Sequence, residues 1–73
     1  MEEFIKMLSS IKPGVDFASE EALVDDGILK SLDIISIISE IAATYGVIIP
    51  SDEIIPDNFN SAEALFELVE DLK

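Results

Sequence analysis

Cysteine and histidine are both absent from this 73-residue sequence. Their absence excludes disulfide bonds, thiolate nucleophiles, the usual zinc sites and a serine that is activated by a histidine. Positive charge is scarce as well, because four lysines face sixteen acidic residues and the formal net charge is -12. Such a chain repels nucleic acid and anionic membranes, and it should attract basic protein surfaces.

Long apolar runs are also missing, and none approaches the roughly 20 residues of a membrane-spanning helix. Met1 is followed by acidic residues and not by a basic, apolar leader, so we expect no signal peptide. The lack of cysteine is consistent with a cytoplasmic protein. Apolar residues nevertheless make up 49% of the chain, which favours a folded domain over an acidic disordered tail. We therefore expect one small domain over residues 1–73, stable by about 5 kcal/mol or less.

The spacing of apolar residues predicts three main helices. The first covers residues 2–12, where apolar side chains recur three and four positions apart. The second covers residues 31–45 and ends at Gly46, and the last runs from residue 61 to about residue 72. The second helix should bury one broad apolar face, made of Ile34, Ile35, Ile37, Ile38, Ile41, Ala42 and Tyr45.

The connection over residues 15–30 is long for a compact domain. Its apolar side chains are too many for a free linker, so we expect the connection to lie on the core, and residues 19–23 are a candidate for a short helical turn. The predicted fold is therefore all-α, a small bundle of three to four helices with a long first loop.

The second connection, before the last helix, gives weaker signals. Residues 47–50 are the best strand candidate but have no obvious partner, and residues 51–55 are a candidate for a short helical turn that Pro56 closes. Residues 58–60 are predicted to form a turn. Asn60, followed three residues later by Glu63, resembles a capping box at the start of the last helix.

Ser31 stands where the second helix is predicted to begin. Its hydroxyl can cap a free backbone N–H, or it can stand at the surface where another protein reaches it. Two features favour the surface: the long loop delivers Ser31 to the rim of the bundle, and Leu32 is predicted to point outward. Lys30 is a poor base for Ser31 because adjacent side chains on a helix diverge, so we expect neither catalysis by this chain nor a metal site.

The run from Asp26 to Ile35 resembles the modification motif of acyl carrier proteins, usually Asp-Ser-Leu followed by an acidic or polar residue. Residues 45–50 resemble the aromatic residue, short loop and proline of that family, and residues 60–64 resemble the start of its last helix. The length, the acidity and the position of the serine also fit. The resemblance therefore covers nearly the whole chain.

The resemblance implies a fold of acyl-carrier type and a carrier function. In that family the serine, here Ser31, accepts a 4'-phosphopantetheine arm from coenzyme A, and a separate magnesium-dependent phosphopantetheinyl transferase does the chemistry. The arm's thiol then holds an acyl group as a thioester for partner enzymes of fatty-acid, lipid or secondary-metabolite biosynthesis. A cytoplasmic monomer that is not itself an enzyme is expected. Alternatives are an aminoacyl carrier (D-alanyl or peptidyl) and an unmodified acidic adaptor with the carrier fold.

The resemblance also implies two groups of contact residues. Docking onto enzymes with basic surfaces would use the start and polar face of the second helix: Lys30, Leu32, Asp33, Ser36 and Glu40. An acyl pocket between helices would be lined by Ile38, Ala42, Ile49, Ile55 and Ala62. Lys30 departs from the family, which has at that position an aspartate that helps to bind the transferase and its metal. The second helix is also poor in acids, and both departures point to a specialised carrier with its own partners.

Overall fold

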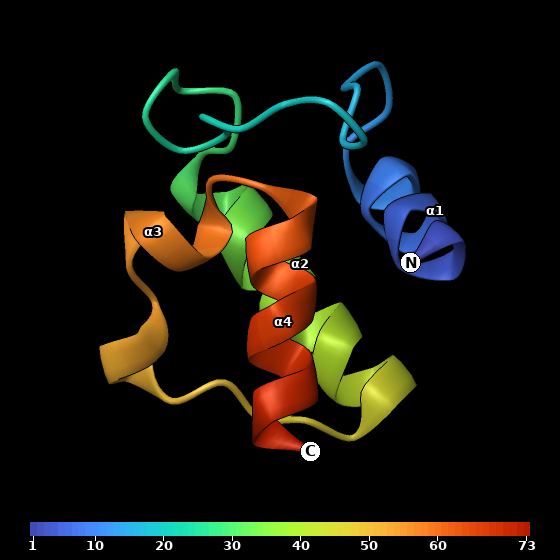
Figure 1. The fold of residues 1–73 in the computed structure, drawn as a ribbon, viewed down its shortest axis with the longest axis vertical. Coiled ribbons are helices and arrows are strands. Elements are labelled where there is room, and N and C mark those ends of the chain that lie inside the picture. Colours follow the sequence, from blue (N-terminus) through green and yellow to red (C-terminus); the bar gives the residue numbers. More distant parts are fainter.

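The computed structural model describes all residues, 1–73, and consists of helices joined by irregular segments (Figure 1). The elements, with η1 a short 3-10 helix, are α1 (Glu2–Ile11), α2 (Ser31–Tyr45), η1 (Ser51–Glu53), α3 (Pro56–Phe59) and α4 (Ala62–Leu72). The prediction of a small all-α bundle with a long first loop is confirmed. None of the helices in the structure is both long enough and apolar enough to cross a membrane.

The core is wholly apolar, because all fourteen buried residues are hydrophobic. Helix α1 packs against both α2 and α4, and Phe4 of α1 is the common contact. Its ring centroid lies 5.9 Å from that of Tyr45 on α2 and 5.3 Å from that of Phe66 on α4, the latter in an edge-on arrangement. Buried Ile37 and Ile41 extend this packing along α2. The middle of α2 is thereby held in the core, while its beginning reaches the rim of the bundle.

Helix α2 has the predicted bounds, and Gly46 ends it in the left-handed conformation, with φ of 70°. The prediction for its apolar face is wrong at one position, since Ile35 is 58% exposed. At about 100° per residue, Ile35 is displaced from the centre of the buried stripe, which Ile37 and Ile41 occupy, and lies one turn from the exposed Leu32. The buried face is therefore narrower than the run of isoleucines indicates.

The first connection lies on the core as predicted, with Phe17, Leu23 and Leu29 buried. The helical turn predicted for residues 19–23 does not form. Asp16 forms local hydrogen bonds with the start of this segment instead. Its backbone oxygen accepts from the N–H groups of Ser19 and Glu20, and its carboxylate accepts from the Ser19 hydroxyl at 2.5 Å. Such local side-chain bonds stabilise turns at the expense of helix.

The second connection differs from the predictions at several points. No strand forms at residues 47–50, since no other extended segment is present to pair with them. Pro56 opens helix α3 instead of closing the segment before it, because a proline at the first helical position loses no intrahelical bond. Residues 58–60 are accordingly not a separate turn, since α3 extends to Phe59.

Asn60 does not cap the last helix. Ser61 is the capping residue of α4, and its Oγ accepts from the N–H of Ala64 at 3.0 Å. The side chain of Asn60 turns instead to the first connection, where its Oδ1 accepts from the N–H groups of Val24 and Asp25 at 2.9 and 3.0 Å. Asn60 thus joins two connections that are far apart in the sequence.

Candidate functional site

At the start of α2, the capping position belongs to Lys30, and the Ser31 hydroxyl takes no part in the cap. Lys30, with extended backbone at φ −95° and ψ 172°, occupies the capping position, and Ser31 is the first helical residue. The carboxylate of Asp33 reaches back and accepts from the Lys30 N–H at 3.0 Å. Ser31 is therefore not the capping residue, and its hydroxyl takes part in none of the side-chain hydrogen bonds of the chain.

Ser31 and its neighbours face solvent. Lys30 and Ser31 are exposed and Leu32 is 77% exposed, as the sequence predicts for Leu32. The first bond of the helical ladder runs from the Ile34 N–H to the Lys30 carbonyl oxygen at 3.0 Å. The N–H groups of the three preceding residues have no acceptor within the helix, and the helix dipole adds partial positive charge there. An exposed hydroxyl thus stands beside donors that suit an anion.

Asp33, one of the expected docking residues, is engaged within the chain. The Nζ of Lys12 lies 2.8 Å from its Oδ2, so a salt bridge joins the end of α1 to the start of α2. The hydrogen bond from Lys12, followed by that from the Lys30 N–H, lowers the pKa of Asp33 below its ordinary value. Asp33 is half-buried and its charge is balanced by that of Lys12, so it should attract a basic partner only weakly.

Of the other expected docking residues, Ser36 and Glu40 are exposed on α2. Glu40 accepts a hydrogen bond from the hydroxyl of Thr44 at 3.3 Å and has no lysine partner. Ile35, which the sequence placed in the core, joins this outer face. The signal that would have found it is its spacing, because Ile35 follows the outward Leu32 by three residues and Ser31 by four.

A small apolar cavity of about 120 Å³, partly open to solvent, lies close to the start of α2. Its lining consists of Val24, Ile34, Ile54, Ile55, Pro56 and Phe59. Ile55 is the one expected pocket residue among them. Ile49 and Ala62 are buried in the core, whereas Ile38 and Ala42 are half-buried on α2. The cavity is comparable in size to those that hold a single small aromatic molecule.

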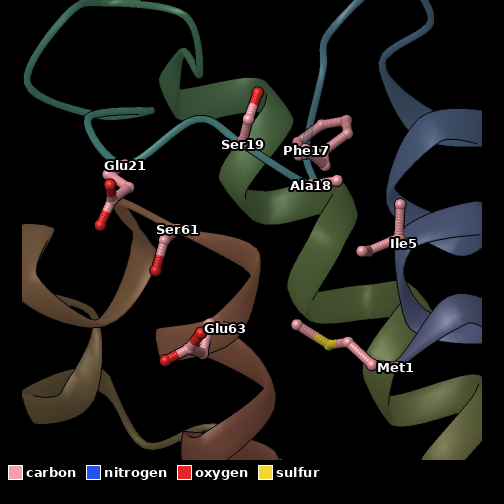
Figure 2. A pocket seen from close by; sticks show the side chains of 8 residues that line it. All are labelled: Met1, Ile5, Phe17, Ala18, Ser19, Glu21, Ser61 and Glu63. Carbon is pink, nitrogen blue, oxygen red and sulfur yellow. The ribbon is translucent and has the colours of Figure 1, made fainter.

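Two wider clefts lie away from Ser31. One, of about 490 Å³, lies between α1, the first connection and the start of α4 (Figure 2). In Figure 2, Met1, directly before α1, and Ile5 of α1 extend toward the side of the cleft that carries Glu63. The other, of about 530 Å³, lies between the ends of α1 and α4 and includes Tyr45. Neither cleft is lined by a residue of the first turns of α2, so neither adds a group to the surroundings of Ser31.

Acidic side chains do not gather into a group of three or more that would hold a metal ion. Comparison of the chain with models of known protein families, with curated proteins and with solved structures finds no match. The function must therefore follow from the chemistry of the chain's own residues. The group best placed for chemistry is the Ser31 hydroxyl, which is exposed, free of internal hydrogen bonds and next to an exposed leucine.

Proposed function

We propose that this chain is a carrier of acyl-carrier type, in which Ser31 accepts 4'-phosphopantetheine and presents a thioester-bound acyl group to partner enzymes. The observation that supports this most directly is the free, exposed hydroxyl at the first position of α2. A structural serine at a helix start would use its oxygen as a cap, but here Lys30 holds the capping position, its N–H bonds to Asp33, and the Ser31 oxygen caps no N–H group. The hydroxyl therefore has no internal role that modification would disrupt.

The residues around Ser31 fit a phosphodiester. The Ser31 Oγ would form a bond to the β-phosphorus of coenzyme A, and the bond from that phosphorus to adenosine 3',5'-bisphosphate would break. We assign the base that takes the hydroxyl proton to the transferase, because the chain has no histidine and the carboxylate closest to Ser31 in the sequence, Asp33, is paired with Lys12. The free N–H groups of the first turn are suited to donate to the new phosphodiester. The arm supplies the thiol that a chain without cysteine lacks.

The partners that follow are a phosphopantetheinyl transferase and the enzymes that load and unload the thioester. Fatty-acid, lipid and secondary-metabolite synthesis all employ such chemistry, and we place the carrier in the cytoplasm, where coenzyme A is at hand. An aminoacyl cargo would use the same attachment at Ser31.

The test is modification of the full chain. Incubation with coenzyme A, Mg²⁺ and a broad-specificity phosphopantetheinyl transferase should add one phosphopantetheine, measured by intact mass. Ser31→Ala should remain unmodified, while Ser51→Ala, which changes an exposed serine of η1, should be modified like the wild type. These two variants distinguish Ser31 from the other serines of the chain.

Lys30 supports a second candidate, the unmodified acidic adaptor, because it places an exposed positive charge directly before Ser31. The variant Lys30→Asp decides between the two. If Lys30 hinders the transferase, Lys30→Asp should be modified faster than the wild type. If neither the wild type nor Lys30→Asp accepts the arm from any transferase tried, the carrier proposal is wrong and the adaptor is favoured.

A further inference from the structure

The outer face of α2 carries little charge, although the chain as a whole carries -12. The exposed residues of this face are Ser31, Leu32, Ile35, Ser36, Ser39, Glu40, Ala43 and Thr44. Glu40 is the one charged residue among them. The other acid of α2, Asp33, is paired with Lys12. The remaining acidic residues of the chain lie outside α2, so this face carries little of the negative charge of the chain.

Two large apolar side chains stand on this nearly neutral face, Leu32 at 77% and Ile35 at 58% exposed. Their spacing of three residues makes them neighbours on the helix surface. A single exposed leucine is ordinary, but here two apolar side chains adjoin each other and lie within one turn of a free hydroxyl. A transferase that brings its reacting phosphate to the Ser31 Oγ approaches the part of α2 on which both of them stand.

We infer that the transferase acting at Ser31 docks on α2 through an apolar, uncharged surface that receives Leu32 and Ile35. The inference deepens the proposed function and rests on it. Charge complementarity supports this partner, because a basic surface would meet one unpaired carboxylate here, Glu40, and would also approach Lys30. An apolar surface would instead remove two large side chains from water.

The experiment measures kcat and KM for phosphopantetheine transfer to the full chain, with the transferase that modifies the wild type. Leu32→Ser and Ile35→Ser should each raise KM about tenfold, since each removes an apolar side chain from the contact. Neither residue touches the reacting atoms, so kcat should change little. Leu32→Met, which keeps an apolar side chain of similar size, should restore most of the affinity.

Two control variants complete the set. Ile48→Ser changes an equally exposed isoleucine, 75% exposed, on the irregular segment after α2, and it should leave KM as in the wild type. Glu40→Gln removes the unpaired charge of the face and should change KM by less than about twofold. Thermal unfolding of every variant shows whether the bundle is intact.

A larger rise in KM for Glu40→Gln than for Leu32→Ser would overturn the inference, since docking would then be electrostatic. A KM for Leu32→Ser equal to that for Ile48→Ser would overturn it as well. Both results leave Ser31 modified, so the proposed function would stand. If phosphopantetheine is added to neither the wild type nor Lys30→Asp, the proposed function fails and the inference fails with it.

Discussion

The two long connections of the bundle, residues 12–30 and 46–61, contribute equally to the core but are held in different ways. Each supplies three buried apolar side chains: Phe17, Leu23 and Leu29 in the first, Val47, Ile49 and Phe59 in the second. Asn60 of the second connection accepts hydrogen bonds from the middle of the first, and the ends of the first are in addition tied together through the salt bridge of Lys12 with Asp33. The second leaves isoleucines in solvent: Ile48, Ile54 and Ile55.

The difference shows how Ser31 is positioned. The first connection ends directly at Ser31, and the salt bridge between Lys12 and Asp33 closes the two ends of this connection against each other. Asn60 holds its middle by accepting from two backbone N–H groups. The position of the Ser31 hydroxyl thus depends on contacts between residues that are far apart in the sequence. The second connection does not end at a candidate site residue. Substitutions at Leu23, at Asn60 and at the pair of Lys12 and Asp33 each weaken one of the contacts that hold the first connection.

The largest loss of stability is expected when a buried apolar side chain of the first connection is shortened. Leu23, 1% exposed, should cost about 2–5 kcal/mol of unfolding free energy when changed to alanine, because the variant loses buried area and leaves a cavity. A domain of this size has about that much stability in total. Urea unfolding followed by far-UV circular dichroism should therefore find Leu23→Ala largely unfolded at the temperature where the wild type is folded.

The matched control comes from the second connection. Ile48 is 75% exposed, so Ile48→Ala should change the free energy of unfolding by less than about 0.5 kcal/mol. Equal destabilisation by Leu23→Ala and Ile48→Ala would mean that burial does not distinguish these two positions and would contradict the comparison.

A smaller effect is expected from the polar contact between the connections. Asn60→Ala removes the acceptor of the Val24 and Asp25 N–H groups, and this should cost about 1–3 kcal/mol because the part-buried N–H of Val24 is left without a partner. Asn58 serves as the control, since its Nδ2 donates to the Glu53 carbonyl oxygen within the second connection. Asn58→Ala should be the milder change. The Val24 amide hydrogen should exchange faster with solvent in Asn60→Ala than in the wild type, and its exchange rate should be unchanged in Asn58→Ala.

Asn60 also illustrates which parts of the fold the sequence predicts. The positions of α1, α2 and α4 follow from apolar spacing, because that signal is local and each helix buries one face. The role of Asn60 does not follow, since its partners lie 35 and 36 residues away and its spacing to Glu63 matches a capping box equally well. Short helices such as α3 escape prediction for a related reason: four residues are too few to show a period.

The same division applies to the candidate site. The exposure of Leu32 follows from its place opposite the buried stripe of α2, and this prediction is confirmed. The exposure of Ile35 could have been read from its spacing to Leu32, but the pairing of Asp33 with Lys12 could not be predicted, because it depends on how α1 packs beside α2. That packing reduced the charge of the outer face, which the sequence alone had assigned to acidic docking. Modification of Ser31 stays a prediction until the transferase experiment is done.

The smallest expected effect concerns the salt bridge that closes the first connection. The pKa of Asp33 is lowered in the folded chain, chiefly by its hydrogen bond to Lys12, so the pair stabilises the fold above the ordinary pKa of 3.8. This contribution is lost as the pH falls below 3.8 and through the lower pKa of the folded state, because protonated Asp33 no longer attracts Lys12. A double-mutant cycle of Lys12→Met and Asp33→Asn should give a coupling of about 0.5 kcal/mol at neutral pH.

The pH dependence of this coupling is the decisive measurement. It should be constant well above the ordinary pKa of 3.8 and should fall toward zero as the pH drops below that value and the carboxylate becomes protonated in the folded chain as well. A coupling that does not change over this range would show that the two side chains do not interact as a charged pair. The first connection would then depend on Asn60 and its buried side chains alone, and Asp33 would return to the outer face of α2 as a free charge beside Ser31.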